Sequence, residues 1–246
     1  MQTKTIKGLT FGDGMPKICI PLTGKGLPAV LSELSYASAQ PCDLYEWRAD
    51  CFYGGPSELL HFLTDKKGER PLLCTIRTKR EGGNADYTPE TYENAVAELL
   101  ETGLCDLIDV ELSCGEERVK RLVRLARERD AAVVLSKHNF EQTPPKEEIE
   151  QTLVKMAELG ADLPKYAAMP RTPRDVLALL TATLDASERI GPVITMSMGA
   201  LGRITRAGGA LFGSCLTFAA GVNSSAPGQI DAEDLSAILE DLLESV

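Results

Sequence analysis

Lys165 and His138 are two side chains of this sequence that could act together on a carbonyl compound. Lys165 lies in the apolar run PKYAAMP (164–170), where an ammonium group would lose hydration and has no evident carboxylate partner nearby in the sequence. Such a lysine tends to release its proton, and the uncharged amine can attack a carbonyl carbon. His138 ends the segment VVLSKH (133–138), and its imidazole suits removal of a proton beside an iminium on Lys165. The pair therefore predicts chemistry through a Schiff base.

Each of these residues also has a purely structural explanation. Lys165 could extend its aliphatic stem out of the fold so that the ammonium reaches solvent, and an isolated histidine near a strand end is often structural. Lys137 is a second candidate amine, but side chains alternate along a strand, which turns Lys137 away from the face that carries His138. The functional interpretation therefore depends on the residues that surround the pair.

Charged and polar residues close several other apolar runs. Glu46 and Arg48 end one run, and the two-residue period of a strand places them on the same face. Arg206 is expected beyond the loop that follows the seventh run. Arginines gathered with a lysine and a histidine at one rim indicate a pocket for a small carboxylate or a polyol acid, and a phosphate ester would also fit. The rim residues expected besides Lys165 and His138 are Glu46, Arg48, Arg77, Glu81, Arg206, Ser225 and Gln229.

Short apolar runs, each typical of a buried strand, alternate with amphipathic segments typical of helices. The eight runs cover 17–22, 42–49, 71–77, 105–113, 131–137, 161–169, 192–198 and 214–220. The expected helices include 27–38, 93–103, 116–130, 146–160, one that starts at Thr172-Pro173 with Asp175, and a final helix over 231–246. Strict alternation predicts a parallel sheet covered by helices, and eight units are the number that closes a barrel.

We therefore expect residues 1–246 to form one domain, an α/β fold of the (β/α)8 TIM-barrel class. The first 14 residues, which include the turn-forming GDG, are expected to form a short β-hairpin across the bottom of the barrel. An open doubly wound sheet is the alternative, but no predicted strand is followed by GxGxxG or GxxxxGK[ST]. In a barrel the chemistry takes place at the carboxyl ends of the strands, which is where the rim residues fall.

Composition argues against several classes of partner. A formal net charge of -10 and a pI near 4.9 disfavour general binding to nucleic acid or anionic lipid. No apolar run approaches the roughly 18 residues of a membrane span, and the amino terminus lacks the apolar core of a signal peptide, so a cytoplasmic protein is expected. The seven cysteines include no CxxC pair and no Cys/His cluster, which predicts reduced thiols and no metal site.

The sequence as a whole resembles the type I 3-dehydroquinate dehydratases, lyases of the shikimate pathway. The resemblance rests on six motifs in the family's order and spacing, which are EWRAD (46–50), TIRTKREGG (75–83), SKHNF (136–140), PKYAAMP (164–170), SMGALGRITR (197–206) and SSAPGQI (224–230). It implies a (β/α)8 barrel, usually a homodimer, that converts 3-dehydroquinate to 3-dehydroshikimate and water without a metal or an organic cofactor.

The resemblance also implies a role for each rim residue. Lys165 matches the lysine that forms the Schiff base, and His138 matches the residue that removes the C2 proton and helps the C1 hydroxyl leave in a syn elimination. Glu81 matches a carboxylate that orients and tunes this histidine, and Arg206 would bind the substrate carboxylate. The other positions that match substrate-binding residues are Glu46, Arg48, Arg77, Ser225 and Gln229.

Two positions depart from the family's pattern. Pro164 precedes the lysine where an aliphatic residue is more usual, and because proline removes a backbone donor we expect a bulge or a strand start there. Tyr166 is also bulkier than expected, but its side chain should point away from Lys165. Two other functions stay open from the residues alone. One is a Schiff-base aldolase acting on a sugar phosphate, with a Gly-rich phosphate site after the last two runs, and the other is a catalytically silent barrel domain.

Overall fold

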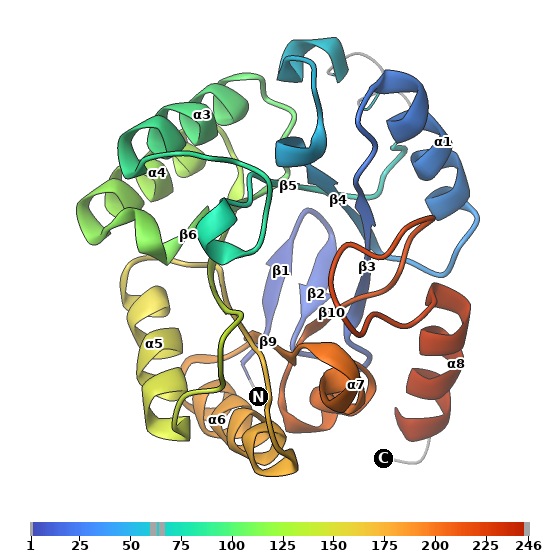
Figure 1. The fold of residues 1–246 in the computed structure, drawn as a ribbon, viewed down its shortest axis with the longest axis vertical. Helices are drawn as coiled ribbons and strands as arrows, with labels where there is room; N and C mark the ends of the chain where they lie inside the picture. Colours follow the sequence, from blue (N-terminus) through green and yellow to red (C-terminus); the bar gives the residue numbers. More distant parts are fainter. Residues whose placement is uncertain (1, 60–62, 64–66, 244–246) are drawn as a thin grey trace.

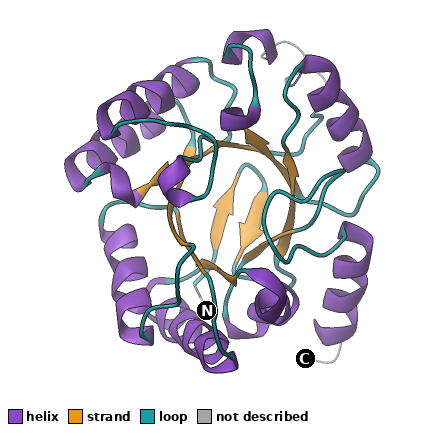
Figure 2. Ribbon diagram, viewed as in Figure 1, coloured by secondary structure: helices purple, strands orange, loops and turns teal. Residues whose placement is uncertain are grey.

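The computed structural model describes residues 2–59, 63 and 67–243, which form a ring of parallel strands surrounded by helices (Figure 1). One sheet holds eight strands in the order β10-β3-β4-β5-β6-β7-β8-β9. Their bounds are β3 Lys17–Leu22, β4 Leu44–Arg48, β5 Leu72–Thr75, β6 Leu107–Glu111, β7 Ala132–Asn139, β8 Leu163–Ala168, β9 Ile194–Ser197 and β10 Leu216–Phe218. A bridge between Val193 and Ser214 joins the two edges, so the ring closes (Figure 2). The predicted strands and the TIM-barrel class are confirmed.

The helices form the outer layer of the barrel (Figure 2). They are α1 Leu27–Ser38, α3 Pro89–Glu101, α4 Glu116–Glu128, α5 Lys146–Glu158, α6 Pro173–Ile190, α7 Gly199–Gly208 and α8 Ala232–Leu243, with 3-10 turns η1 Ala49–Cys51, η2 Lys79–Glu81, η3 Leu112–Cys114 and η4 Gly209–Phe212. Helix α6 starts at the predicted cap, where Thr172 and Asp175 form a capping box. The last residues of the predicted final helix, 244–246, lie outside the described residues.

The segment that follows β9 differs from the expected loop, because residues 199–208 form helix α7. Its glycines are typical of a loop in sequence, but Gly202 has a packing role. A Cβ atom at Gly202 would lie 2.1 Å from the carbonyl oxygen of Ser197, so only glycine lets the helix pack directly on the end of β9. This packing places Arg206 on a helix above the mouth of the barrel.

An antiparallel hairpin closes the opposite end of the barrel. It consists of β1 Lys4–Ile6 and β2 Leu9–Phe11 and is visible through the ring in Figure 1. The buried side chains of Ile6 and Phe11 belong to the same apolar cluster as Cys19, Leu44 and Leu107 inside the barrel. The expected hairpin is confirmed, although the chain reverses at residues 7 and 8, both with positive φ, and GDG leads from the hairpin to β3.

The strand that carries Lys165 tolerates both unusual neighbours. Strand β8 begins at Leu163, and Pro164 aligns with Leu135 of β7 in a continuous register, so the strand-start alternative is correct and no bulge forms. The Tyr166 ring faces outward into the helix-side core, where the Lys137 ammonium lies 5.7 Å from the ring centroid. Both outward orientations agree with the alternation expected from sequence.

None of the helices in the described part of the chain combines the length and apolarity needed to cross a membrane.

Candidate active site

A cleft of about 520 Å³ opens at the carboxyl ends of the barrel strands, and all nine predicted rim residues line it. Strands β4, β7 and β8, the segment after β5 that includes η2, and helix α7 contribute the reactive and charged side chains. Met196, Met198, Phe140 and Phe218 supply apolar walls. The predicted residues brought together here are Glu46, Arg48, Arg77, Glu81, His138, Lys165, Arg206, Ser225 and Gln229. Residues more than a hundred positions apart in the chain therefore share one site.

The Lys165 amine lies at the bottom of the cleft and is almost completely buried, with 4% of the residue exposed. Its Nζ is 3.3 Å from Asp109 Oδ2, 4.0 Å from Glu46 Oε1 and 4.3 Å from the centroid of the Phe218 ring. No carboxylate partner lies near Lys165 in the sequence, as expected, but the fold supplies one from a distant strand. Asp109 is 56 residues away in sequence, on β6, and only closure of the barrel brings it to the lysine.

The His138 imidazole is held by one carboxylate. Glu81 Oε2 lies 2.9 Å from His138 Nδ1 and also accepts a hydrogen bond from the backbone N–H of His138 at 3.0 Å. Two contacts to one oxygen fix the ring orientation and leave Nε2 as the nitrogen that could exchange a proton with a ligand. Burial lowers the pKa of His138 well below 6.5, and the nearby cations Arg77, Lys165 and Arg48 lower it further. The imidazole is thus neutral at neutral pH, which is the form that a general base needs.

Burial has the opposite effect on Glu81. It raises the pKa of this carboxyl group from 4.5 to about 7, against the influence of the Arg77 cation and with Glu111 adding to the rise. Near neutrality Glu81 therefore changes between its protonated and its ionised form, while the hydrogen-bonded His138 stays neutral. An ionised Glu81 favours a positive imidazole, and this pair can support proton uptake by His138 during a reaction.

We expect the raised pKa of Glu81 to reduce folding stability at alkaline pH. The folded-state pKa of Glu81, about 7, lies above its ordinary value of 4.5. The contribution of protonated Glu81 to the free energy of unfolding is therefore complete below about pH 4.5 and is lost as the pH rises through 7. Glu81→Gln removes this titration, and the stability of the variant relative to wild type should be higher at pH 8 than at pH 5, by about 1–3 kcal/mol. Urea unfolding at both pH values measures the difference. The same difference in stability between variant and wild type at pH 5 and at pH 8 would contradict the raised pKa of Glu81.

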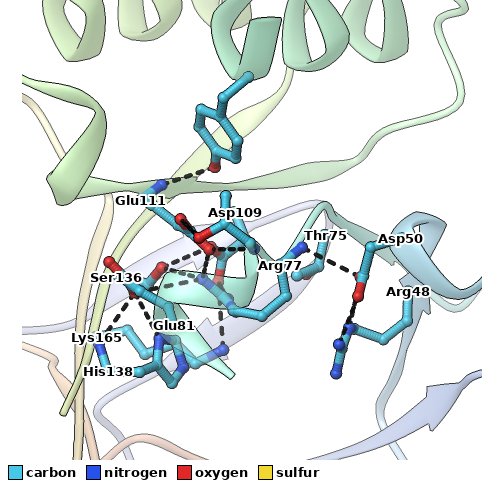
Figure 3. Close-up of polar contacts among 12 residues, drawn as sticks. Arg48, Asp50, Thr75, Arg77, Glu81, Asp109, Glu111, Ser136, His138 and Lys165 are labelled. Carbon is cyan, nitrogen blue, oxygen red and sulfur yellow. Dashed lines mark hydrogen bonds and ion pairs between the residues drawn. The ribbon is translucent and has the colours of Figure 1, made fainter. Parts of the chain in front are cut away.

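Arg77 occupies the centre of a buried ionic network (Figure 3). Its Nη2 lies 2.8 Å from Asp109 Oδ2, and its Nη1 lies 3.0 Å from Glu111 Oε1 and 3.7 Å from Glu81 Oε2. Nη1 also donates to Ser136 Oγ at 3.0 Å. The residue lines the cleft as predicted, and its guanidinium also organises the acids around the lysine and the histidine. Its contact with a substrate stays a prediction.

Arg48 and Arg206 differ in their partners. Arg48 makes a two-point ion pair with Asp50, at 2.8 and 2.7 Å (Figure 3). Arg206 is buried and donates to the carbonyl oxygens of Pro227 at 3.1 Å and Phe218 at 3.4 Å, and among the described residues no carboxylate pairs with it. Burial lowers the pKa of Arg206 to about 10. A buried guanidinium without an anion is suited to binding an anionic ligand.

Ser225 and Gln229 contact each other in the loop that follows β10. The Gln229 amide oxygen accepts from the Ser225 N–H at 2.7 Å, and its nitrogen donates to Ser225 Oγ at 3.0 Å. Gly228 has φ of +83°, and a Cβ there would lie 2.4 Å from the carbonyl oxygen of Gly199, so the loop packs closely on the start of α7. The two predicted residues thus shape the loop that borders the cleft.

Four polar residues of the site were not predicted from sequence. Asp109 and Glu111 both point inward from β6, Ser136 bridges Asp109 and Arg77, and Asp50 fixes Arg48. The sequence contains a signal for Asp109 and Glu111. They are two residues apart in CDLIDVELS (105–113), the same spacing that places Glu46 and Arg48 on one face of a strand. They were overlooked because they lie within an apolar run instead of at its end.

Comparisons with known proteins agree over the length of the chain. Residues 18–245 match the family model described as type I 3-dehydroquinase. The chain is 44% identical over 246 residues to a 3-dehydroquinate dehydratase of Syntrophotalea carbinolica, covering 97% of each chain. It resembles the crystal structure of a type I 3-dehydroquinate dehydratase from Clostridium difficile with covalently modified comenic acid, with 40% identity, 100% and 99% coverage and a TM-score of 0.94. A 3-dehydroquinate dehydratase structure from Geobacillus kaustophilus gives 38% identity, 99% and 97% coverage and a TM-score of 0.92.

Proposed function

The chain belongs to the type I 3-dehydroquinase family, and from this we propose that its cleft converts 3-dehydroquinate to 3-dehydroshikimate and water through a Schiff base on Lys165. The observation that carries the proposal is the joint placement of a buried amine, a neutral imidazole and an unpaired arginine in one cleft of the described chain. The covalently modified comenic acid of the C. difficile relative is consistent with a nucleophile in that protein. The same family membership disfavours the aldolase and the silent barrel.

The proposed reaction begins with attack of the Lys165 amine on the C3 ketone. The Lys165 ammonium first releases one proton, and this proton is taken up again when the carbonyl oxygen leaves as water, so that a protonated iminium remains on Nζ. His138 then takes a proton from C2, and the electron pair flows into the iminium to give an enamine. The electrons return from the enamine to expel the C1 hydroxyl, which receives the proton from His138 and leaves as water. Hydrolysis of the conjugated iminium consumes one water, releases the product and restores the lysine.

The test of this function is direct. Purified protein mixed with 3-dehydroquinate should produce rising ultraviolet absorbance from the conjugated enone of the product. Borohydride added during turnover should fix ligand mass on the peptide that contains Lys165, because it reduces the iminium to a stable amine. Absence of the absorbance change would refute the dehydratase, whereas turnover with mass fixed on another peptide would refute the assignment of the lysine.

Arg206 is proposed to bind the substrate carboxylate, since it is the arginine of the cleft for which the described residues provide no anion. Arg206→Met should lower kcat/KM for 3-dehydroquinate by at least about 30-fold, equivalent to about 2 kcal/mol of a buried charge pair. Arg203→Met, which removes an exposed arginine from the same helix, is the matched control and should retain wild-type kinetics. Similar losses in both variants would assign the effect to helix α7 and contradict a specific carboxylate contact.

A homodimer is proposed on the same family basis, and exposed apolar side chains support it. Leu177 of α6 and Leu201 and Ile204 of α7 are 63%, 45% and 65% exposed, on helices that contact each other. Ile204→Glu should shift the mass in solution from dimer toward monomer, because it places a charge in an apolar interface. Tyr53→Glu, at another exposed position, serves as the control in light scattering. A wild-type protein that is monomeric at micromolar concentration would refute the dimer.

Residues 1–246 are further proposed to form one domain located in the cytoplasm. One continuous eight-stranded ring supports a single domain, which predicts coincident unfolding curves by fluorescence and circular dichroism. Free thiols at all seven cysteines support a reducing compartment, and fractionation of the source cells tests that location. Separate unfolding transitions or recovery outside the cytoplasm would refute the respective proposal.

A further inference from the structure

We propose that Asp109 is the fixed counter-ion of the Lys165 nitrogen and keeps that nitrogen positively charged both as the ammonium and as the iminium. This inference rests on the proposed Schiff-base function and adds a positioning residue to it. Asp109 Oδ2 lies 3.3 Å from Lys165 Nζ, and Asp109 is completely buried, so water does not weaken the interaction.

The Asp109 carboxylate is held from three directions. Oδ1 accepts a hydrogen bond from Ser136 Oγ at 2.6 Å, while Oδ2 faces Arg77 Nη2 at 2.8 Å and Lys165 Nζ. These partners come from β7, from β8 and from the segment after β5, and Figure 3 shows the three side chains gathered around Asp109. A carboxylate fixed in this way does not need to reorient when the charge on the lysine changes during the reaction.

Asp109 is suited to hold a charge rather than to accept a proton. Burial alone would raise its pKa, but Arg77, Lys165 and the Ser136 hydroxyl outweigh this and hold the pKa below its ordinary value of 3.8. It therefore stays ionised throughout the neutral range. Glu81, by contrast, has a pKa of about 7, and His138 is a neutral imidazole that can accept a proton, so acid–base work and charge balance belong to different residues.

Charge conservation explains why the lysine needs a permanent counter-ion. An ammonium and a ketone form a protonated iminium and water, so one positive charge is present on Nζ before and after the condensation. Loss of the iminium proton would give a neutral imine, which withdraws electrons from C2 far less strongly. A carboxylate beside Nζ disfavours that loss. The nitrogen is neutral as the attacking amine, in the carbinolamine that this attack forms and in the enamine, and the charge returns when a hydroxyl leaves.

The other groups that face Lys165 do not provide an equivalent contact. Glu46 of β4 is farther away, at 4.0 Å from Nζ, and accepts a hydrogen bond from Thr75. The Phe218 ring of β10 offers only its π face, and the thiol of Cys19 on β3 is buried. His138 of β7 is neutral, and Arg77 repels the lysine instead of pairing with it. Asp109 is the nearest anion among the described residues.

The experiment compares Asp109→Asn with the matched control Glu111→Gln. Both substitutions remove a buried carboxylate partner of Arg77, but no contact joins Glu111 to Lys165 among the described residues. The probe is 3-dehydroshikimate, which carries the ketone that the amine attacks. Each protein is mixed with it between pH 5 and 10 and quenched with borohydride, and the rate at which adduct mass appears on Lys165 is followed.

In wild type the rate of adduct formation should rise with pH as the amine loses its proton. Asp109→Asn should move the midpoint of this rise to lower pH by about one unit or more, because the ammonium loses its anion. The steady-state dehydration rate should fall by about tenfold or more at the same time, because the imine is less fully protonated. Glu111→Gln should keep its midpoint within roughly 0.3 pH unit of wild type.

A more conservative substitution, Ser136→Ala, tests the counter-ion role if Asp109→Asn does not fold. Ser136→Ala removes a donor to Asp109 and so leaves more negative charge for the lysine, which should move the midpoint upward by a few tenths of a pH unit. An unchanged midpoint in the folded Asn variant, equal shifts in the two carboxylate variants, or a downward shift in Ser136→Ala would overturn the counter-ion role. Lack of any adduct on Lys165 in wild type would instead overturn the Schiff-base proposal on which it rests.

Discussion

Replacing Lys165 by methionine should lower the dehydration rate of 3-dehydroquinate by at least about 10⁴-fold, because the variant has no nitrogen with which to form the iminium. Methionine keeps the length and the apolar stem of lysine, so the barrel core around β8 retains its packing. Without the iminium, the C2 proton is only as acidic as that of an ordinary ketone, and His138 has no electron sink to draw on.

The ultraviolet assay at saturating substrate measures this loss, and borohydride should leave the variant unlabelled. Lys137→Met is the matched control, since Lys137 neighbours His138 but points to the outer layer, where it lies over Tyr166. That variant should keep nearly full activity and normal labelling of Lys165. A Lys165→Met enzyme that turns over as fast as its parent would end the covalent mechanism.

His138→Ala should separate the two halves of the reaction. Borohydride should still fix 3-dehydroquinate mass on Lys165, because the amine and its Asp109 partner remain, while steady-state dehydration falls by about 10² to 10⁴-fold. The cause is loss of the base that takes the C2 proton and then assists the leaving hydroxyl. Intact mass after trapping and the ultraviolet assay give the two readouts on one sample.

Added imidazole provides the control for this variant. Truncation to alanine opens space in the cleft, and free imidazole should restore part of the rate with a dependence on the concentration of its neutral form. A merely structural histidine would give no such rescue. Full turnover by His138→Ala without imidazole, or loss of trapping together with loss of turnover, would contradict a role confined to proton transfer.

The strands of the barrel were predictable because each is a short apolar run followed by an amphipathic helix, and a parallel sheet requires that alternation. The placement of the rim residues followed from the rule that parallel strands end at one face. Helix α7 was missed because Gly199 and Gly202 are typical of loops, whereas here Gly202 permits close contact with Ser197. The roles of individual residues came from the family motifs and not from the pattern of the chain.

The ionic network could not be predicted in the same way. Lys165 has no partner nearby in sequence because its carboxylate is on β6, and the pairing depends on the register of two strands that do not neighbour each other in the sheet. The position of Arg77 at the centre of three carboxylates has the same origin. Strand register and ring closure are tertiary properties, and local periodicity does not contain them.

The β1–β2 hairpin affects how ligands and water reach the active site. Ile6 and Phe11 stop the lower end of the barrel with apolar side chains, so ligand and solvent exchange with Lys165 by the upper mouth. In the proposed Schiff-base cycle, the water of condensation, the water eliminated from the ring and the water that hydrolyses the adduct would all pass through the same mouth as the substrate.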